Sequence, residues 1–158
     1  SKPEKDWLPE RWAAGCDSLY SDDGLQPVLV GGRSARELDA ERIIRERATT
    51  PIRAELGSGL RKLISILDAS ALVLAPDTGP LHMAVAMNRP VISLLGYTNP
   101  KRTGPYRRFH DLMIDAYAND GEDYVPTMEN RPGRMPRITV DDVLARVDVW
   151  RQRYSASR

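Results

Sequence analysis

The chain has 158 residues, of which 41% are hydrophobic and 28% are charged. These values exclude a disordered or collagen-like protein and predict one globular domain over residues 1–158. With 23 basic and 22 acidic side chains the formal net charge is +1, which provides no overall field to attract nucleic acid.

Three further features narrow the class of protein. No apolar run is long enough to cross a bilayer, so we expect a soluble chain. The single cysteine, Cys16, cannot form an internal disulfide, and no Cys/His cluster has metal-ligand spacing, which favours a reducing compartment and a protein without a metal. The sequence starts at Ser1 with neither Met nor a signal-like segment, so we expect it to be cut from a longer protein.

Hydrophobic periodicity predicts helices that alternate with short strands. In chain order we expect a helix at 9–20, a strand at 27–30, helices at 34–47 and 59–69, a strand at 71–75, a helix at 81–87, a strand at 90–95 and a helix from 139 to about 154. Ser34, with Glu37 in capping-box spacing, and Thr139 are the predicted N-caps. Residues 116–137, rich in Pro and Gly, form an irregular connection.

The three strands predict the fold class. Each is a continuous apolar run, which is typical of burial on both faces in a parallel sheet covered by helices. The predicted fold is therefore α/β, a Rossmann-like parallel sheet flanked by helices.

The most informative segment follows the strand at 71–75. Asp77, Thr78 and Gly79 stand where that strand ends and a helix begins, and the unpaired N–H groups and positive dipole of a helix start suit a phosphate. Gly79 lets the anion approach, whereas Asp77 suits sugar hydroxyls. Ligands of open α/β sheets bind at this edge. The plainer alternatives are that Asp77 or Thr78 only caps the helix, and that His82 is only a packed, hydrogen-bonded side chain.

A basic loop follows the strand at 90–95. Residues 96–108 combine hydroxyls and glycines with four basic side chains, Lys101, Arg102, Arg107 and Arg108. These side chains either help to neutralise a diphosphate or form a solvated surface loop. The sequence contains neither a GxGxxG fingerprint nor a GxxxxGK[ST] loop, which disfavours classical dinucleotide and P-loop sites.

Several sequence blocks, taken in order, are similar to those of one family. They are KDWLPERW at 5–12, VLVGG at 28–32, DTGPLH at 77–82, and LGYTNP at 95–100 with GPY at 104–106. Over nearly the whole chain they resemble the heptosyltransferases of glycosyltransferase family 9. The resemblance implies the C-terminal, donor-binding domain of a GT-B enzyme, whose N-terminal acceptor domain is absent from this chain.

The resemblance also implies an activity. It is the inverting transfer of a sugar, heptose in the family, from an ADP-sugar to a lipid-linked, lipopolysaccharide-type acceptor. The implied location is the cytoplasm, with peripheral contact at the inner face of the cytoplasmic membrane. No metal or other cofactor is implied. This half alone is expected to bind the donor without transferring sugar, so no catalytic residue is assigned to it.

Five residues match donor-binding positions of the family. Lys5 matches the lysine that reaches the donor phosphates, and Thr78 and Gly79 match the positions whose backbone N–H groups bind the distal phosphate. Asp77 matches the residue that holds the sugar, and His82 the histidine on the helix behind it.

Four further residues are donor-binding candidates. Glu37 is the candidate for the ribose hydroxyls, Ser58 falls in the stretch that lines the adenine pocket of the family, and Thr98 and Lys101 belong to the loop after the strand at 90–95. The sequence departs from the family at Asn99, where many members have Asp.

Two other function classes stay open at this point. One is a non-catalytic Rossmann-like module that binds a nucleotide or a protein partner. The other is a different GT-B enzyme, such as a sugar-nucleotide epimerase. Selectivity for ADP over UDP and GDP separates the heptosyltransferase reading from both.

Overall fold

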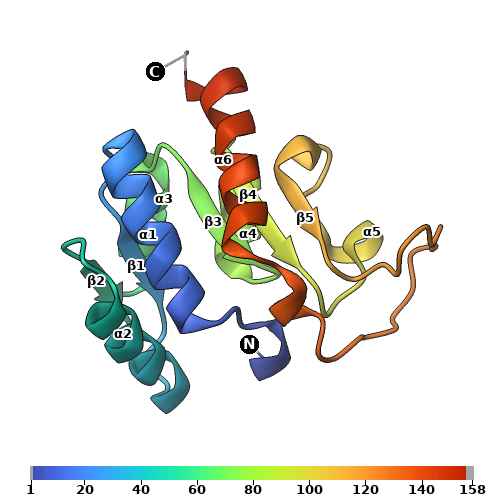
Figure 1. Ribbon diagram of the computed structural model, residues 1–158, viewed down its shortest axis with the longest axis horizontal. Coiled ribbons are helices and arrows are strands. Elements are labelled where there is room, and N and C mark those ends of the chain that lie inside the picture. The colour runs from blue at the N-terminus through green and yellow to red at the C-terminus, as the bar shows by residue number, and fades with distance from the viewer. Residues whose placement is uncertain (1, 156–158) are drawn as a thin grey trace. The chain divides into compact units, whose positions relative to one another are not determined.

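The computed structural model describes residues 2–155. It divides the chain into a smaller unit, Leu8–Ser65, and a larger unit that joins the residues up to Trp7 to those from Ile66 onward. The boundary falls inside helix α3 (Leu60–Ala69). Each unit contains parallel strands flanked by helices (Figure 1), so the predicted α/β class is confirmed. The single domain over 1–158 stays a prediction.

The smaller unit contains two parallel strands. Strand β1 (Val28–Gly31) pairs with β2 (Arg53–Leu56) from Val28 opposite Arg53 to Gly31 opposite Leu56. The helices α1 (Pro9–Asp23) and α2 (Ala35–Arg47) pack against each other. Strand β2 is missing from the elements that the sequence predicts. In this half-buried strand the charged Arg53 and Glu55, which form an ion pair at 3.0 Å, alternate with Ala54 and Leu56. The sequence therefore shows no continuous apolar run at this position.

The larger unit is built on a parallel sheet with the strand order β3-β4-β5. These strands span Val73–Pro76, Val91–Leu95 and Met113–Asp115. All five residues of the central strand β4 are buried, as expected of a strand covered on both faces. Helix α4 (Gly79–Ala86) packs against β3 and β4, and helix α6 (Val140–Arg153) against β4 and β5 (Figure 1). Strand β5 is too short to show in the apolar pattern.

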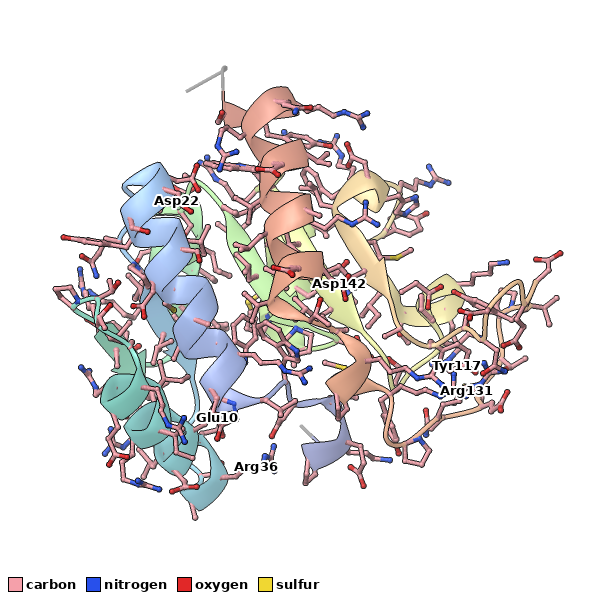
Figure 2. The ribbon with its side chains drawn as sticks, viewed as in Figure 1. Glu10, Asp22, Arg36, Tyr117, Arg131 and Asp142 are labelled. Atoms are coloured by element: carbon pink, nitrogen blue, oxygen red, sulfur yellow. The ribbon has the colours of Figure 1, made fainter. Side chains whose placement is uncertain are left out.

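Short helical turns and one predicted cap complete this unit. The turns are η1 (Pro3–Lys5), α5 (Pro100–Thr103), η2 (His110–Leu112) and η3 (Met135–Arg137). The predicted N-cap of α6 is confirmed, because the Thr139 hydroxyl accepts from the N–H of Asp142 at 3.0 Å and the Asp142 carboxylate, labelled in Figure 2, accepts from the N–H of Thr139 at 2.9 Å. This reciprocal pair satisfies two N–H groups at the helix start.

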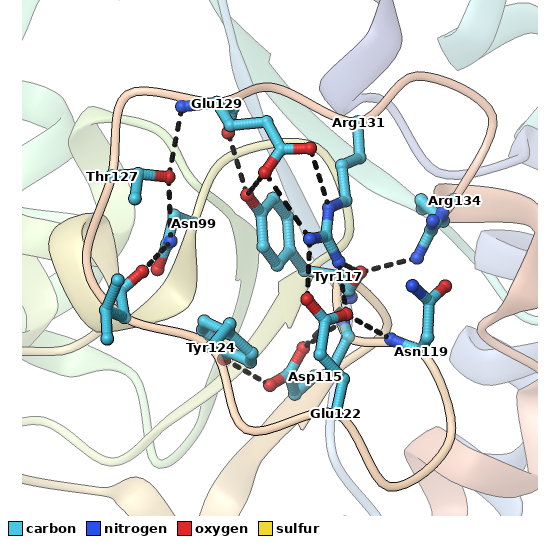
Figure 3. Close-up of polar contacts among 12 residues, drawn as sticks. Asn99, Asp115, Tyr117, Asn119, Glu122, Tyr124, Thr127, Glu129, Arg131 and Arg134 are labelled. Atoms are coloured by element: carbon cyan, nitrogen blue, oxygen red, sulfur yellow. Dashed lines mark hydrogen bonds and ion pairs between the residues drawn. The ribbon is translucent and has the colours of Figure 1, made fainter.

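The irregular connection after β5 is held by a network of polar contacts (Figure 3). We call residues 116–134 the connecting loop. Its Arg131 donates to both carboxylate oxygens of Glu122, at 2.7 and 2.8 Å, and to the carbonyl of Tyr117 at 2.9 Å. The guanidinium also lies over the ring of Tyr117, 4.2 Å from its centroid, and the two residues lie side by side in Figure 2. One arginine thus links Glu122 and Tyr117 within a segment that has no strand or α-helix.

Candidate functional site

Asp77 is the centre of the candidate site in the larger unit. It directly follows β3 and is 9% exposed. Its Oδ1 accepts a hydrogen bond from Nε2 of His82 at 3.0 Å, and its Oδ2 accepts one from the Thr98 hydroxyl at 2.8 Å. The ammonium of Lys5 lies 3.4 Å from the same Oδ2. The structure therefore brings together four of the predicted site residues around one carboxylate.

The other three residues reach Asp77 from separate segments. His82 lies on the first turns of α4, Thr98 in the loop after β4, and Lys5 at the end of η1. Because β3 and β4 are parallel, their carboxyl ends meet at one edge of the sheet, where the following loops converge. The topology thus explains how residues 5, 77, 82 and 98 come together.

Trp7 places the segment that carries Lys5. Trp7 is 3% exposed, and its indole N–H donates to the carbonyl of Ile138 at 2.9 Å. Since Lys5 stands two residues before this anchor, its ammonium is held close to Asp77. Trp7 occurs in the sequence block that resembles the family, but sequence reasoning assigned it no role. A tryptophan directly after a run of charged residues was the available signal.

The electrostatics of the site favour an ionised Asp77. Burial alone raises the pKa of this carboxyl, but the hydrogen bonds from His82 and Thr98 and the charge of Lys5 outweigh it, and the pKa lies below its ordinary value. An ionised carboxylate is an acceptor only. Asp77 consequently holds donors on both of its oxygens at neutral pH.

The plainer alternatives for this turn are met only in part. The N-cap of α4 is Thr78, yet its side chain makes no capping bond, and its hydroxyl donates to the carbonyl of Pro76 at 3.3 Å. The Asp77 carboxylate contacts His82, Thr98 and Lys5. The histidine is hydrogen-bonded, as the alternative supposes, but its side chain is 48% exposed.

The start of α4 retains the features of an anion site. The first N–H groups of a helix have no carbonyl partner within it, and no side chain of Thr78 covers them. Gly79 is the first residue of the helix, and a Cβ built there would meet only Met83 Cε, at 3.7 Å. The position is open enough for a ligand atom to approach the backbone, with His82 one turn further along.

The basic loop turns toward the connecting loop. Lys101 donates to the carbonyl of Tyr124 at 2.6 Å, lies 3.4 Å from Asp123 and stands over the Tyr124 ring at 4.6 Å. Arg102 donates to the carbonyl of Thr127 at 3.0 Å. The structure therefore does not bring Lys101 to Asp77. It places this lysine among contacts that hold the loop.

Glu37 and Ser58 lie in the smaller unit, at the carboxyl ends of β1 and β2. The Glu37 carboxylate accepts from the Ser34 hydroxyl at 2.7 Å and from the N–H of Gly32, and the first of these bonds is the largest cause of its lowered pKa. The Ser58 hydroxyl donates to the carbonyl of Glu55 at 3.2 Å. The two strand ends are joined by a bond from the Gly57 N–H to the Gly31 carbonyl at 2.8 Å.

Two features are absent from residues 2–155. No group of three or more His, Cys, Asp or Glu side chains is arranged to hold a metal ion. Among the helices of this range, none combines the length and the apolar character needed to cross a membrane.

Comparisons with known proteins agree on one family. The family model described as "Glycosyltransferase family 9 (heptosyltransferase)" matches residues 1–120. The lipopolysaccharide core heptosyltransferase OpsX of Haemophilus influenzae is 32% identical over 123 residues, which cover 77% of this chain and 35% of that protein. The lipopolysaccharide heptosyltransferase 3 of Escherichia coli is 29% identical over 149 residues, or 91% of this chain and 42% of that protein.

Two solved structures have a similar fold. A family 9 glycosyl transferase from Veillonella parvula matches 94% of this chain and 42% of its own, with a TM-score of 0.78 at 23% identity. The ADP-heptose lipopolysaccharide heptosyltransferase II of E. coli matches 93% of this chain and 42% of its own, with a TM-score of 0.68 at 25% identity. This chain spans well under half the length of these relatives. The family match over residues 1–120, which includes the Asp77 turn, shows that the chain belongs to glycosyltransferase family 9, the heptosyltransferases.

Proposed function

We propose that this chain binds the donor of a heptosyltransferase reaction, an ADP-sugar, and that its larger unit holds the diphosphate. The observation that carries the proposal is the placement of Lys5 and His82 by Asp77 beside the open start of α4. Two nitrogen-bearing side chains and a helix start converge where a sugar diphosphate would present its negative charge.

Each residue of this cluster has a role in the proposal. The N–H groups at Thr78 and Gly79 bind the distal phosphate, and Lys5 approaches the diphosphate from the N-terminal segment. Asp77 holds Lys5 and His82 in place, and the acceptor capacity that remains on its carboxylate is directed to a sugar hydroxyl. The assignment of Glu37 to the ribose and of Ser58 to the adenine stays a prediction from the family resemblance.

The proposed reaction is an inverting displacement at the anomeric carbon. The acceptor hydroxyl attacks, the bond to the donor phosphate breaks, and negative charge builds on the leaving diphosphate. Preorganised N–H groups and a lysine at that position stabilise the charge, each by about 3 kcal/mol when aligned with it. We retain the prediction that the reaction needs no metal.

The acceptor and the base are assigned outside this chain. As the family resemblance implies, a further domain would bind a lipopolysaccharide-type acceptor and supply the general base, at the cytoplasmic face of the membrane. On this proposal the chain binds donor alone and transfers sugar only with that domain.

Calorimetric titration with ADP, UDP and GDP and their sugars tests the proposal. We expect selectivity for the adenine nucleotides, and we expect Lys5→Met to weaken ADP binding about tenfold, the effect of losing one charge-assisted contact. Lys2→Met is the matched control, because its ammonium lies 5.8 Å over the Tyr97 ring and has no assigned part in the site. An equal response to all three nucleotides would support a general nucleotide-binding module, and no response to any of them would contradict donor binding.

A further inference from the structure

Behind Asp77 lies a chain of two hydroxyl groups. The Thr103 hydroxyl at the end of α5 lies 3.0 Å from the Thr98 hydroxyl, which donates to Asp77 Oδ2 at 2.8 Å. Thr98 is 6% exposed. The side of Asp77 that faces the loop after β4 is thus filled by this chain's own groups.

The single proton of the Thr98 hydroxyl limits the hydrogen bonds that Thr98 can donate. A hydroxyl has one proton to donate and two lone pairs. The proton of Thr98 goes to the ionised carboxylate of Asp77, so its contact with Thr103 must be one in which Thr103 donates. Thr103 can direct its own proton to Thr98 at 3.0 Å or to the carbonyl of Asn99 at 3.2 Å. Thr98 therefore has no proton left for a ligand.

The geometry also shows what this bond controls. Oδ1 of Asp77 faces His82, while Oδ2 receives both Thr98 and Lys5. A carboxylate can rotate about its last side-chain bond, and rotation would move the two oxygens relative to their partners. The Thr98 hydroxyl is the buried, neutral and shortest of the three contacts, so it fixes the rotation that aligns Lys5 and His82.

We propose that Thr98, supported by Thr103, is a positioning residue that acts on the donor through Asp77 and does not touch it. The inference rests on the proposed function and deepens it, because it names residues that set the geometry of the phosphate-binding groups. Thr98 thereby leaves the set of direct donor ligands.

The test combines Thr98→Val, Thr98→Ser and Thr103→Val in this chain. Valine keeps the shape of threonine and removes the hydroxyl, whereas serine keeps the hydroxyl. By calorimetry we expect Thr98→Val to weaken ADP-sugar binding about tenfold, Thr98→Ser to stay within about twofold of wild type, and Thr103→Val to fall between them, as for a hydrogen bond to a charged group and its second neighbour. If Thr98→Val binds like wild type, the proposal is overturned.

A ligand-free measurement separates this inference from the proposed function. Carboxyl ¹³C NMR gives the titration midpoint of Asp77, and we expect Thr98→Val to raise it, because the charged form loses a donor, while Thr98→Ser leaves it near the wild-type value. If the wild-type chain binds no ADP-sugar, donor binding fails, yet the midpoint still tests the control of Asp77 by Thr98. An unchanged midpoint in Thr98→Val contradicts the positioning role whatever the ligand does.

A double-mutant cycle excludes a merely structural effect. In the Asp77→Asn background, Thr98→Val should cost no further affinity, because its effect passes through the carboxylate. Additive losses in the two variants would overturn the proposal. If Thr98→Val does not fold, Thr103→Val in the same cycle and the same titration decides the question.

Discussion

Nε2 of His82 lies 3.0 Å from Oδ1 of Asp77, and this bond joins a buried carboxylate to a half-exposed imidazole. Because the ionised Asp77 can only accept, Nε2 must carry the proton. The other ring nitrogen, Nδ1, is then the acceptor of the neutral imidazole and a second donor of the protonated one. The pair fixes both the orientation and the tautomer of a group at the edge of the proposed phosphate site.

Replacing Gly79 by Ala separates folding from binding. The added methyl group meets only Met83 Cε at an ordinary 3.7 Å, so we expect the melting temperature to stay the same or to rise, as for a Gly to Ala change without strain, worth about 0.4–1 kcal/mol. On the proposed function the same methyl group stands where the distal phosphate approaches, and donor affinity should fall at least about tenfold.

Gly15→Ala on α1 is the control for this prediction, since a Cβ there meets nothing within 4 Å. It should match the stability change and leave affinity unchanged. Calorimetry and thermal unfolding of both variants make the comparison. Unimpaired ADP binding by Gly79→Ala would remove the start of α4 from the site.

Asn99→Asp should release the connecting loop. Asn99 is 1% exposed, its Oδ1 accepts from the Lys101 N–H at 3.0 Å, and its Nδ2 donates to the carbonyl of Val125 at 2.8 Å. Aspartate keeps the first bond but sets a carboxylate oxygen against the Val125 carbonyl. We expect a loss of about 1–3 kcal/mol in the free energy of unfolding and faster amide exchange in residues 116–134.

The exposed Asn130→Asp, which adds the same charge to the same loop, is the control. Urea unfolding and hydrogen exchange measure both variants. Equal protection of the loop in Asn99→Asp and wild type would show that the Val125 contact does not hold it.

The stability of the protein should depend on pH through the ionisation of Glu122 in the connecting loop. The hydrogen bonds from Arg131, followed by one from the Asn119 backbone, lower the pKa of Glu122 from 4.5 to about 2. Because the pKa is lower in the folded than in the unfolded chain, the ionised Glu122 stabilises the fold at pH values above the unfolded-state pKa. This stabilisation is lost as the pH falls from 4.5 toward 2. Glu122→Gln should therefore be less stable than wild type at pH 7, and the difference should shrink on acidification.

Denaturant unfolding at a series of pH values measures this difference. Glu46→Gln is the control, because Glu46 pairs with Arg42 on the exposed face of α2, where an ion pair contributes little. A difference between Glu122→Gln and wild type that stays constant down to pH 2 would show that the Arg131 contact does not cause the acid dependence.

Trp7→Phe tests the anchor of Lys5. The change removes the donor to the Ile138 carbonyl, which belongs to a residue only 1% exposed. Losing this hydrogen bond to a buried residue should cost about 0.5–1.5 kcal/mol of stability. We also expect a weaker affinity for ADP with an unchanged affinity for adenosine, because in the proposed function Lys5 contacts only the phosphates. Equal losses for both ligands in calorimetry would show a general defect instead.

Local pattern was enough to predict most of the elements, and local pattern together with the family resemblance selected three residues that lie close together. The apolar strands, the caps at Ser34 and Thr139, and the cluster of Lys5, Asp77 and His82 all follow from residues close in sequence or from the family resemblance. Strands β2 and β5 were not predicted, because β2 alternates charged with apolar residues and β5 has only three residues. Neither produces a continuous apolar run.

What sequence reasoning could not supply is the pairing of distant polar groups. Lys101 is basic and stands in the expected loop, yet its ammonium binds the Tyr124 carbonyl. Thr98 and Thr103 have ordinary hydroxyls whose roles depend on where Asp77 lies in space. These roles are set by tertiary contacts that leave no periodic signal.

The bond between Trp7 and Ile138 joins positions 131 residues apart. During synthesis the chain emerges from the ribosome in order, so the segment with Lys5 waits unanchored until the start of the last helix has been made. The proposed phosphate-binding cluster can therefore be completed only after Ile138 has been synthesised. A nascent chain that stops short of Ile138 would lack the anchor that holds Lys5 beside Asp77.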